Sequence, residues 1–265
     1  MSPLSAQKPN ILLDSHGHFI SLQIEAFRCI SNTLIEFSPQ LNVFSGDNGA
    51  GKTTILEALS VLNTGRSFRS HRASSVIQHN TDYAVALGSL VSSTGRSHTL
   101  GVQLGRHERT IKIDGSVATS RAELSQHWIA QVIDPNIHFL VDGGPDQRRT
   151  FLNWGVFHVE PKFLEKWQRY RRILQQRNVA LKAGLSESEI RAWDIELIEL
   201  GEAIRDGRDR YLAELSKNLT AVSDQLLGSA ITLEHRWGWA KNRPLGEILA
   251  GSLDKDRAFK STQAG

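Results

Sequence analysis

Hydrophobic and polar residues alternate along the first part of the chain, as they do in half-buried strands. Leu22, Ile24 and Ala26 occupy every second position, with polar residues between them. Similar apolar runs predict further strands near 34–37, 41–44, 83–91, 98–104 and 110–113, with turns at Gly95-Arg96 and Asp114-Gly115. These patterns predict a sheet in the first half of the chain, and the strands between 83 and 113 are expected to be antiparallel.

Apolar residues recur at three- and four-residue steps after about Gly144, which is the spacing of one helix face. One series runs from Phe163 to Leu181, and a second runs over 190–226. Between them, Ser186 and Glu189 have the spacing of a capping box, in which each side chain satisfies a free backbone donor. The pattern predicts an antiparallel helical hairpin, and its simplest role is to pack against itself.

The change of pattern predicts three regions: a disordered lead-in over 1–20, a first lobe over 21–144 and a helical second lobe over 145–265. The first twenty residues are mixed and polar, and they lack the apolar stretch of a secretory signal. No apolar run reaches the roughly eighteen residues that a membrane span needs. No membrane partner is therefore expected.

Composition adds little to this reading. The 265 residues are enough to bury a substantial core, and the net charge of +3 is compatible with a nucleic-acid partner without establishing one. The single cysteine, Cys29, excludes an intramolecular disulfide and fits a reducing cytoplasm.

Residues 46–54 read GDNGAGKTT and match the P-loop pattern G-x-x-x-x-G-K-[ST]. The glycines allow the backbone to turn so that its N–H groups point at phosphate oxygens. Lys52 would reach the β- and γ-phosphates, and the Thr53 hydroxyl would coordinate Mg²⁺. An apolar stretch precedes the motif, and an amphipathic helix is predicted after it, from about Gly51 to Leu62. ATP with Mg²⁺ is expected to bind at Gly46, Asp47, Asn48, Gly49, Ala50, Gly51, Lys52, Thr53 and Thr54.

Hydrolysis requires more than this loop, because a carboxylate on a later strand must hold the metal and another group must orient water. The best candidate strand, 131–134, is short and runs directly into Pro135, so we do not assign it this role. No ABC-type signature of the Ser-Gly-Gly-Gln kind occurs either. The catalytic residues stay unassigned, and whether this chain hydrolyses ATP stays open.

Five short motifs lie one after another over about 20–260. They are Ala26-Phe27-Arg28, the segment GDNGAGKTTILEALSVL, Gly65-Arg66-Ser67-Phe68-Arg69, the segment GGPDQRRTFLNWGVF at 143–157, and Gln176-Arg177-Asn178 followed by Trp193-Asp194. Together they resemble the RecF family of bacterial recombination mediators, which are relatives of the structural-maintenance-of-chromosomes and ABC ATPases.

The resemblance implies an α/β P-loop NTPase of the ABC/SMC head type, with a mixed sheet, adjacent antiparallel strands and a helical second lobe. It also implies an ATP-dependent homodimer in the cytoplasm that binds single-stranded or gapped DNA. Such proteins act in recombinational repair, replication and the SOS response to DNA damage, with RecO and RecR, and they help RecA to load. Full-length members are expected to be weak DNA-stimulated ATPases.

The chain departs from the family pattern at two places. The family usually has Asp where Asn153 stands, and a threonine-proline-acid sequence where Asp134-Pro135-Asn136 stands. The family also continues past residue 265 with its signature, a Walker B acid and a switch histidine, so the chain resembles the first two-thirds of such a protein. Apolar faces that later strands would cover are then expected to be exposed.

Two other functions are weighed against this one. A truncated, non-catalytic nucleotide-binding remnant is an alternative for the 265-residue chain itself. A metabolic P-loop kinase is less favoured, because no lid-like arginine loop and no acceptor-site acid can be recognised.

Basic residues gather in two segments that are candidates for DNA contact. The 65–72 loop carries Arg66, Arg69 and Arg72 with no acid, and we favour DNA binding because the resemblance places this loop just after the P-loop helix. For the basic helix over 161–182, DNA contact and a solvated face both stay open.

Arg28 follows the first predicted strand. The resemblance to SMC-like heads suggests that it lies near the phosphates or ribose of the nucleotide, and an ordinary surface charge is the alternative.

Overall fold

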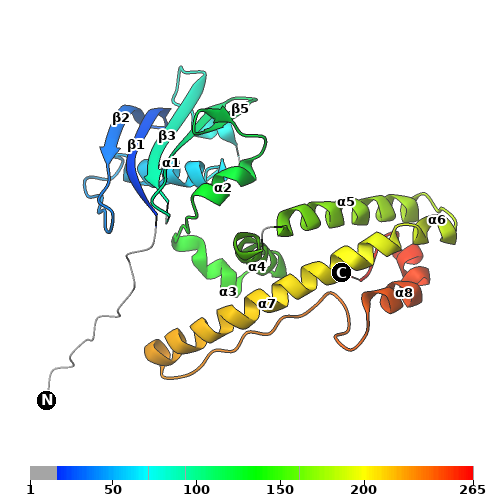
Figure 1. The fold of residues 1–265 in the computed structure, drawn as a ribbon. Helices are drawn as coiled ribbons and strands as arrows, with labels where there is room; N and C mark the ends of the chain where they lie inside the picture. Colours follow the sequence, from blue (N-terminus) through cyan, green and yellow to red (C-terminus); the bar gives the residue numbers. More distant parts are fainter. Residues whose placement is uncertain (1–16, 71, 93, 161, 265) are drawn as a thin grey trace, which may run out of the picture. The chain divides into compact units, whose positions relative to one another are not determined.

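The computed structural model describes residues 17–70, 72–92, 94–160 and 162–264, so most of the predicted lead-in over 1–20 lies outside the described residues. The first strand begins at His18, three positions before the expected start at Ser21. The chain divides into two compact units, Met1–Asp134 and Pro135–Gly265 (Figure 1). The division falls before the boundary expected at Gly144. Arg148 of the second unit donates to the carbonyls of Val141 and Gly143, so this part of the chain contacts the helical residues that follow it.

Unit 1 is built on one antiparallel sheet. Its strands are β1 (His18–Phe27), β2 (Ile30–Glu36), β3 (Tyr83–Val91), β4 (Ser97–Gly105), β5 (Arg109–Ile113) and β6 (Ser116–Val117), in the order β2-β1-β3-β4-β5-β6. In the register, Leu22 of β1 is opposite Ile35 of β2 on one side and Gly88 of β3 on the other. The predicted strands over 22–26, 34–37, 83–91, 98–104 and 110–113 are confirmed, with small shifts at their ends.

The strand predicted at 41–44 is wrong. Residues 41–46 have no regular secondary structure, and the side chains of Leu41 and Val43 are 75% and 78% exposed. An extended segment becomes a strand only when a neighbouring strand satisfies its backbone groups, and none of the described strands pairs with this one. Two large apolar side chains beside the glycine-rich loop therefore lie in solvent.

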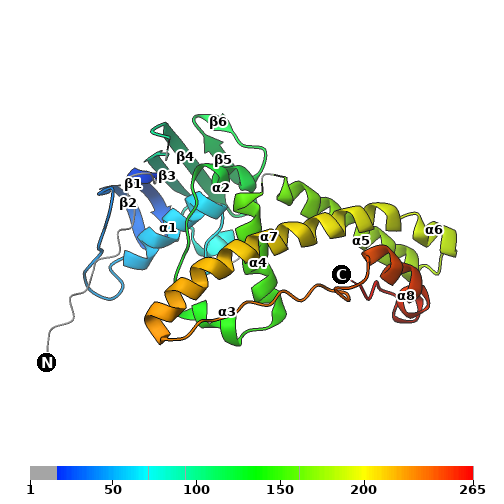
Figure 2. The ribbon, with the colours of Figure 1, turned by 60° about the horizontal axis from the view of Figure 1, so that its bottom comes forward.

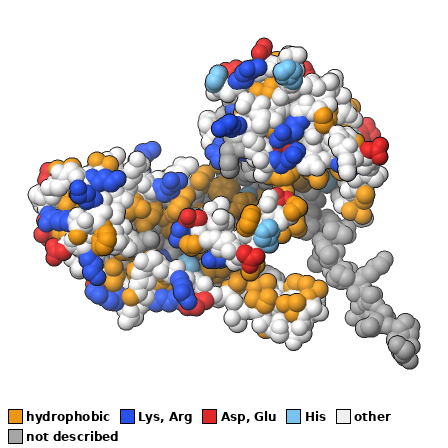
Figure 3. Space-filling model, turned by 180° about the vertical axis from the view of Figure 1, so that it is seen from behind, with side chains coloured by type: hydrophobic (Ala, Val, Ile, Leu, Met, Phe, Trp, Pro, Cys, Tyr) orange, Lys and Arg blue, Asp and Glu red, His pale blue; other side chains and the backbone are white. Residues whose placement is uncertain are grey.

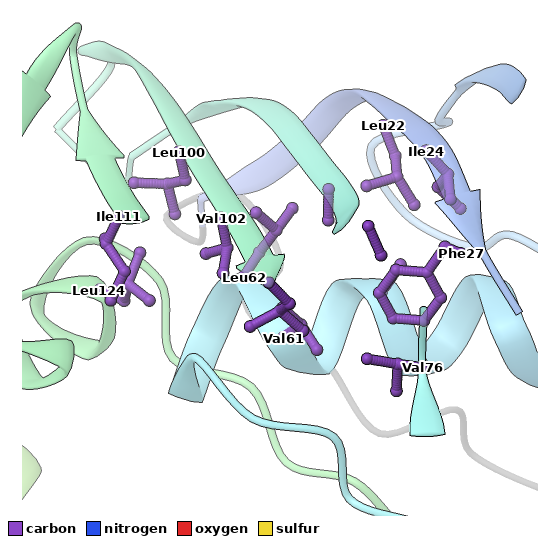
Figure 4. Close-up of a cluster of buried hydrophobic side chains, with 14 of the residues drawn as sticks. Leu22, Ile24, Phe27, Val61, Leu62, Val76, Leu100, Val102, Ile111 and Leu124 are labelled. Atoms are coloured by element: carbon purple, nitrogen blue, oxygen red, sulfur yellow. The ribbon is translucent and has the colours of Figure 1, made fainter. Parts of the chain in front are cut away.

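Helix α1 (Lys52–Thr64) covers one face of the sheet and completes the core of unit 1. Figure 4 shows Val61 and Leu62 of α1 pointing toward the strands, close to Val102 of β4, and all three side chains are at most 1% exposed. A Cβ at Gly88 would lie 2.3 Å from Cε1 of Phe19 on β1 and 2.6 Å from Cδ1 of Leu62 on α1, so a larger residue at this position would have to displace both side chains. Short helical turns η2 (Ala73–Ser75), η3 (Arg121–Glu123) and α2 (Leu124–His127) complete unit 1.

Unit 2 is helical. It consists of η4 (Pro135–His138), α3 (Phe139–Asp142), α4 (Pro145–Val159), α5 (Phe163–Lys182), α6 (Glu187–Arg191), α7 (Asp194–Leu227) and α8 (Leu245–Phe259). Helices α5 and α7 lie side by side and run in opposite directions (Figures 1 and 2), which confirms the predicted hairpin. Ser186 and Glu189 form the predicted capping box at the start of α6.

A buried ion cluster joins three helices of unit 2. The side chain of Arg177 on α5 is fully buried; its Nε donates to Asp194 on α7 at 2.7 Å, and its Nη1 donates to Asp256 on α8 at 2.7 Å. Nη1 also donates to the hydroxyl of Thr262 at 2.8 Å. The Gln176-Arg177-Asn178 and Trp193-Asp194 motifs therefore have a structural role inside unit 2.

Candidate nucleotide-binding site

The glycine-rich loop before α1 has the backbone conformation that its sequence predicts. Gly46, Gly49 and Gly51 have φ angles of 142°, 86° and 98°, which residues with a Cβ rarely adopt. A Cβ at Gly49 would meet no atom within 4 Å, so the backbone conformation, and not crowding, requires glycine there.

Helix α1 begins directly at this loop, and its first turn suits an anion. Gly51 provides no side-chain cap, and no acidic residue occupies the first turn. The first N–H groups of a helix have no partner inside the helix, and they carry the positive end of the helix dipole. The loop and the start of α1 therefore form an arrangement that attracts phosphate.

Lys52 lies across the loop that it follows. Its Nζ donates to the carbonyl oxygens of Gly46 at 2.7 Å and Asp47 at 2.8 Å. The ammonium group is thus held over the loop, and it could exchange these two carbonyls for phosphate oxygens. Among the predicted nucleotide contacts, these hydrogen bonds bring Lys52 together with Gly46 and Asp47.

The two threonines after Lys52 lie in different surroundings. Thr53 is exposed, which fits a hydroxyl that would hold the Mg²⁺ of a bound nucleotide. Thr54 is buried, and its Oγ1 is 3.7 Å from Sγ of Cys29. Within the described ranges, no group of three or more His, Cys, Asp or Glu side chains could hold a metal ion. The assignments of both threonines stay predictions.

Arg28 lies in the turn between β1 and β2, at a φ of 53°. Its Nε and Nη2 donate to the two carboxylate oxygens of Glu57 at 2.5 and 2.6 Å, and its Nη1 donates to the Ser75 carbonyl at 2.9 Å. The hydrogen bonds to Glu57 raise the pKa of Arg28 above its usual value. Arg28 is therefore held in place by a buried carboxylate on the helix that follows the P-loop, and its contact with a nucleotide stays a prediction.

Glu57 is a site residue that sequence reasoning missed. It lies on α1 with no exposed surface, accepts a hydrogen bond from the Ser67 hydroxyl, and is 3.7 Å from the guanidinium of Arg69. It therefore connects the P-loop helix to Arg28 on one side and to the 65–72 loop on the other. An acidic residue among the apolar positions of the predicted helix was the signal that could have revealed it.

The predicted DNA contacts lie on the surface of unit 1, where Arg66, Arg69 and Arg72 are all exposed. Figure 3 shows lysine and arginine side chains on the surfaces of both units. Arg66 and Arg72 line a small hollow that also includes Arg109 of β5. On α5, by contrast, Arg177 is buried in its ion cluster and Arg169 pairs with Glu196, so part of that basic helix has a structural role.

Comparison with known proteins identifies the family of the chain. A family profile described as "AAA domain" matches residues 21–199, which places the chain among the AAA-type P-loop proteins. The DNA replication and repair protein RecF of Azotobacter vinelandii (strain DJ / ATCC BAA-1303) is 40% identical over 245 residues, which are 91% of this chain and 67% of that protein. RecF of Pseudomonas aeruginosa (strain LESB58) is 39% identical over 247 residues, with 92% and 67% coverage. The chain belongs to the RecF family of DNA replication and repair proteins.

Two solved structures share the fold. The recombination mediator protein RecF with ATP superposes with a TM-score of 0.87 at 23% identity, covering 94% of this chain and 72% of that one. The structure of RecF-ATPrS superposes with a TM-score of 0.86 at 23% identity, and the match covers 95% of this chain and 71% of that one. The predicted fold class, an α/β P-loop NTPase of the ABC/SMC head type with adjacent antiparallel strands and a helical second lobe, is confirmed. The sheet was expected to be mixed, but every pairing between the described strands is antiparallel. No helix in the described part of the chain is both long and apolar enough to cross a membrane.

Proposed function

We propose that this protein is an ATP-controlled DNA-binding protein of replication and recombinational repair, acting on single-stranded or gapped DNA. The observation that carries the proposal is the uncapped start of α1 behind a glycine-rich loop, with Lys52 held across that loop. ATP is the proposed nucleotide, since a RecF structure of the same fold was solved with ATP.

In this mechanism the loop N–H groups and the start of α1 bind the phosphates of ATP. Lys52 would exchange its two carbonyl partners for the β- and γ-phosphates, and the Thr53 hydroxyl would hold the Mg²⁺ of the nucleotide, which would neutralise phosphate charge. Arg28 and the 65–72 loop share one carboxylate, Glu57, so a change at the nucleotide site can reach the predicted DNA contacts.

The proposal extends to the assembly and its setting. ATP would be sandwiched between two copies of the chain, and hydrolysis would time the release of DNA. The protein would act in the cytoplasm with RecO and RecR during the SOS response to DNA damage, and would help RecA to load. A solved RecF structure described as belonging to the RecFOR pathway supports this set of partners.

The test is DNA retention with and without ATP. Fluorescence anisotropy of a labelled gapped duplex should show tighter binding when ATP and Mg²⁺ are added to the wild-type chain. Lys52→Ala should abolish this ATP effect, while Lys255→Ala, which removes an exposed lysine from α8, should keep it. An ATP effect that survives in Lys52→Ala would reject control through the P-loop, and a wild-type chain that binds no DNA would reject the function.

A further inference from the structure

Four arginines of unit 1 come together from three separate segments. Arg66 and Arg72 lie in the loop after α1, and with Arg109 at the start of β5 they line one hollow. Arg121 of η3 packs beside them, because a Cβ at Gly65 would lie 3.1 Å from its side-chain Cγ and Cδ. We call these four residues the arginine pocket.

The arginine pocket has no counter-charge of its own. Within the described ranges, none of its four guanidinium groups forms an ion pair. Glu108, the acid next to Arg109 in sequence, packs against Gly105. Burial and the charge of Arg66 lower the pKa of Arg109, and burial together with the charges of Arg66 and Arg109 lowers the pKa of Arg121. Like charges held this close repel one another, and an anion between them would relieve the repulsion.

We propose that the arginine pocket binds one backbone phosphate of DNA. The inference rests on the proposed DNA-binding function and assigns Arg109 and Arg121 to it, in addition to Arg66 and Arg72. Arginine suits this role, since its planar fork of N–H donors matches the oxygens of a phosphate.

The hollow is shallow and has an apolar floor. Its cavity volume of about 10 Å³ is room for about one water molecule, so a phosphate would lie at its mouth, against the exposed arginine side chains. Val76 and Leu104 line the hollow and are at most 2% exposed. An apolar floor lowers the local dielectric constant and strengthens the attraction between arginine and phosphate.

The arginine pocket also lies next to the hydrogen bond that joins the 65–72 loop to the P-loop helix. Ser67, which lines the same hollow, donates its hydroxyl hydrogen bond to Glu57 on the P-loop helix. A phosphate held by Arg66 and Arg72 would therefore restrain a loop that is tied to α1.

The experiment measures DNA affinity against salt concentration for single-arginine variants. Arg109→Ala and Arg121→Ala should each weaken binding to a labelled gapped duplex about tenfold and reduce the slope of log affinity against log salt by about one. The matched control, Arg96→Ala, removes an arginine from the exposed turn between β3 and β4 and should stay within about twofold of wild type. Arg109→Lys keeps the positive charge but lacks the planar guanidinium, so its loss of DNA affinity should be smaller than that of Arg109→Ala.

The outcomes separate the two proposals. If the wild-type chain binds DNA and both pocket variants bind with unchanged affinity and salt slope, the arginine pocket is rejected while the proposed function stands. If the wild-type chain binds no DNA, both are rejected. Thermal unfolding of each variant is the folding check, and relief of repulsion predicts an unchanged or higher Tm for Arg109→Ala.

The phosphate of a free nucleotide is the alternative ligand for the arginine pocket. A fluorescent ATP analogue should lose its binding in Lys52→Ala and keep it in Arg109→Ala. The reverse pattern, with binding that survives in Lys52→Ala and is lost in Arg109→Ala, would show that the pocket holds a free nucleotide and would overturn the assignment to DNA.

Discussion

Both carboxylate oxygens of Glu57 accept hydrogen bonds from Arg28, at 2.5 Å from Nε and 2.6 Å from Nη2. The pair joins the β1–β2 turn to the helix that starts at the P-loop. Ser67 donates to the same carboxylate, so three segments distant in sequence meet at one fully buried acid. Such a carboxylate is stable inside a protein only while its partners remain, because an unpaired buried charge is costly.

Glu57→Ala should therefore destabilise unit 1 strongly. The change leaves the partly buried Arg28 guanidinium without its carboxylate, and the expected loss in the free energy of unfolding is about 3 kcal/mol. Urea denaturation measures it, with Glu36→Ala as the control, since Glu36 is exposed on β2 and forms no ion pair within the described ranges. Equal losses in the two variants would show that the Glu57 cluster contributes nothing specific.

Asn153→Asp should stabilise unit 2. Asn153 Oδ1 accepts from Arg208 Nε at 3.0 Å and Nη2 at 2.8 Å, and burial lowers the pKa of Arg208. The neutral amide thus accepts hydrogen bonds from a largely buried cation, whereas a carboxylate would form a charge-assisted pair there. The expected gain is about 1 kcal/mol at neutral pH.

The gain from Asn153→Asp should depend on pH in one direction. The arginine depresses the pKa of the new carboxyl in the folded protein, so the added stability is present above the unfolded pKa of about 3.9. The added stability disappears as the pH falls through the pKa that this carboxyl has in the folded protein. Asn242→Asp, at an exposed position, is the control for charge alone. A gain of the same size in both variants would contradict the role of Arg208.

The sequence predicted the features that depend on local chain geometry. Alternation identified β1 and β3 because one face of each is buried, and the P-loop was recognised because its residues are consecutive. The strand at 41–44 was wrongly predicted because alternation cannot reveal whether a neighbouring strand exists. Glu57 was missed because its partners lie outside its own helix, in the β1–β2 turn and in the loop after α1. Arg109 reaches the arginine pocket only through the pairing of β5 with β4.

Asp114→Asn should lower the stability of unit 1 at neutral pH but not in acid. Hydrogen bonds from His98 at 2.8 Å and from the Thr99 backbone N–H at 2.7 Å depress the pKa of Asp114. The contribution of Asp114 to stability is therefore present above the unfolded pKa of about 3.9. It is lost as the pH falls through the pKa of Asp114 in the folded protein. Asparagine tolerates the φ of 51° at this position, so the substitution tests charge with little backbone strain.

The effect of Asp114→Asn should be small, below about 1 kcal/mol, because the carboxylate is half exposed and solvent screens it. Thermal unfolding of wild type and variant between pH 7 and pH 3 measures the difference. A gap in Tm that stays constant down to pH 3 would show that the charge of Asp114 does not contribute.

Arg177→Ala should be the most damaging single change in unit 2. Arg177 is fully buried and donates to Asp194, Asp256 and Thr262, so its removal leaves two carboxylates without their cation. Breaking a buried ion pair in this way costs about 3–5 kcal/mol. Arg171→Ala is the matched control, since it removes an exposed arginine of the same helix, and its effect should be within about 0.5 kcal/mol.

Arg177→Lys separates charge from geometry at the same position. A lysine would restore the positive charge, but it cannot reach helices α7 and α8 with the fixed fork of a guanidinium. We therefore expect Arg177→Lys to recover only part of the lost stability in guanidinium denaturation. Full recovery in Arg177→Lys would mean that charge alone holds α5 against α7 and α8. If Arg177→Ala loses no more stability than Arg171→Ala, the buried ion cluster does not stabilise the unit.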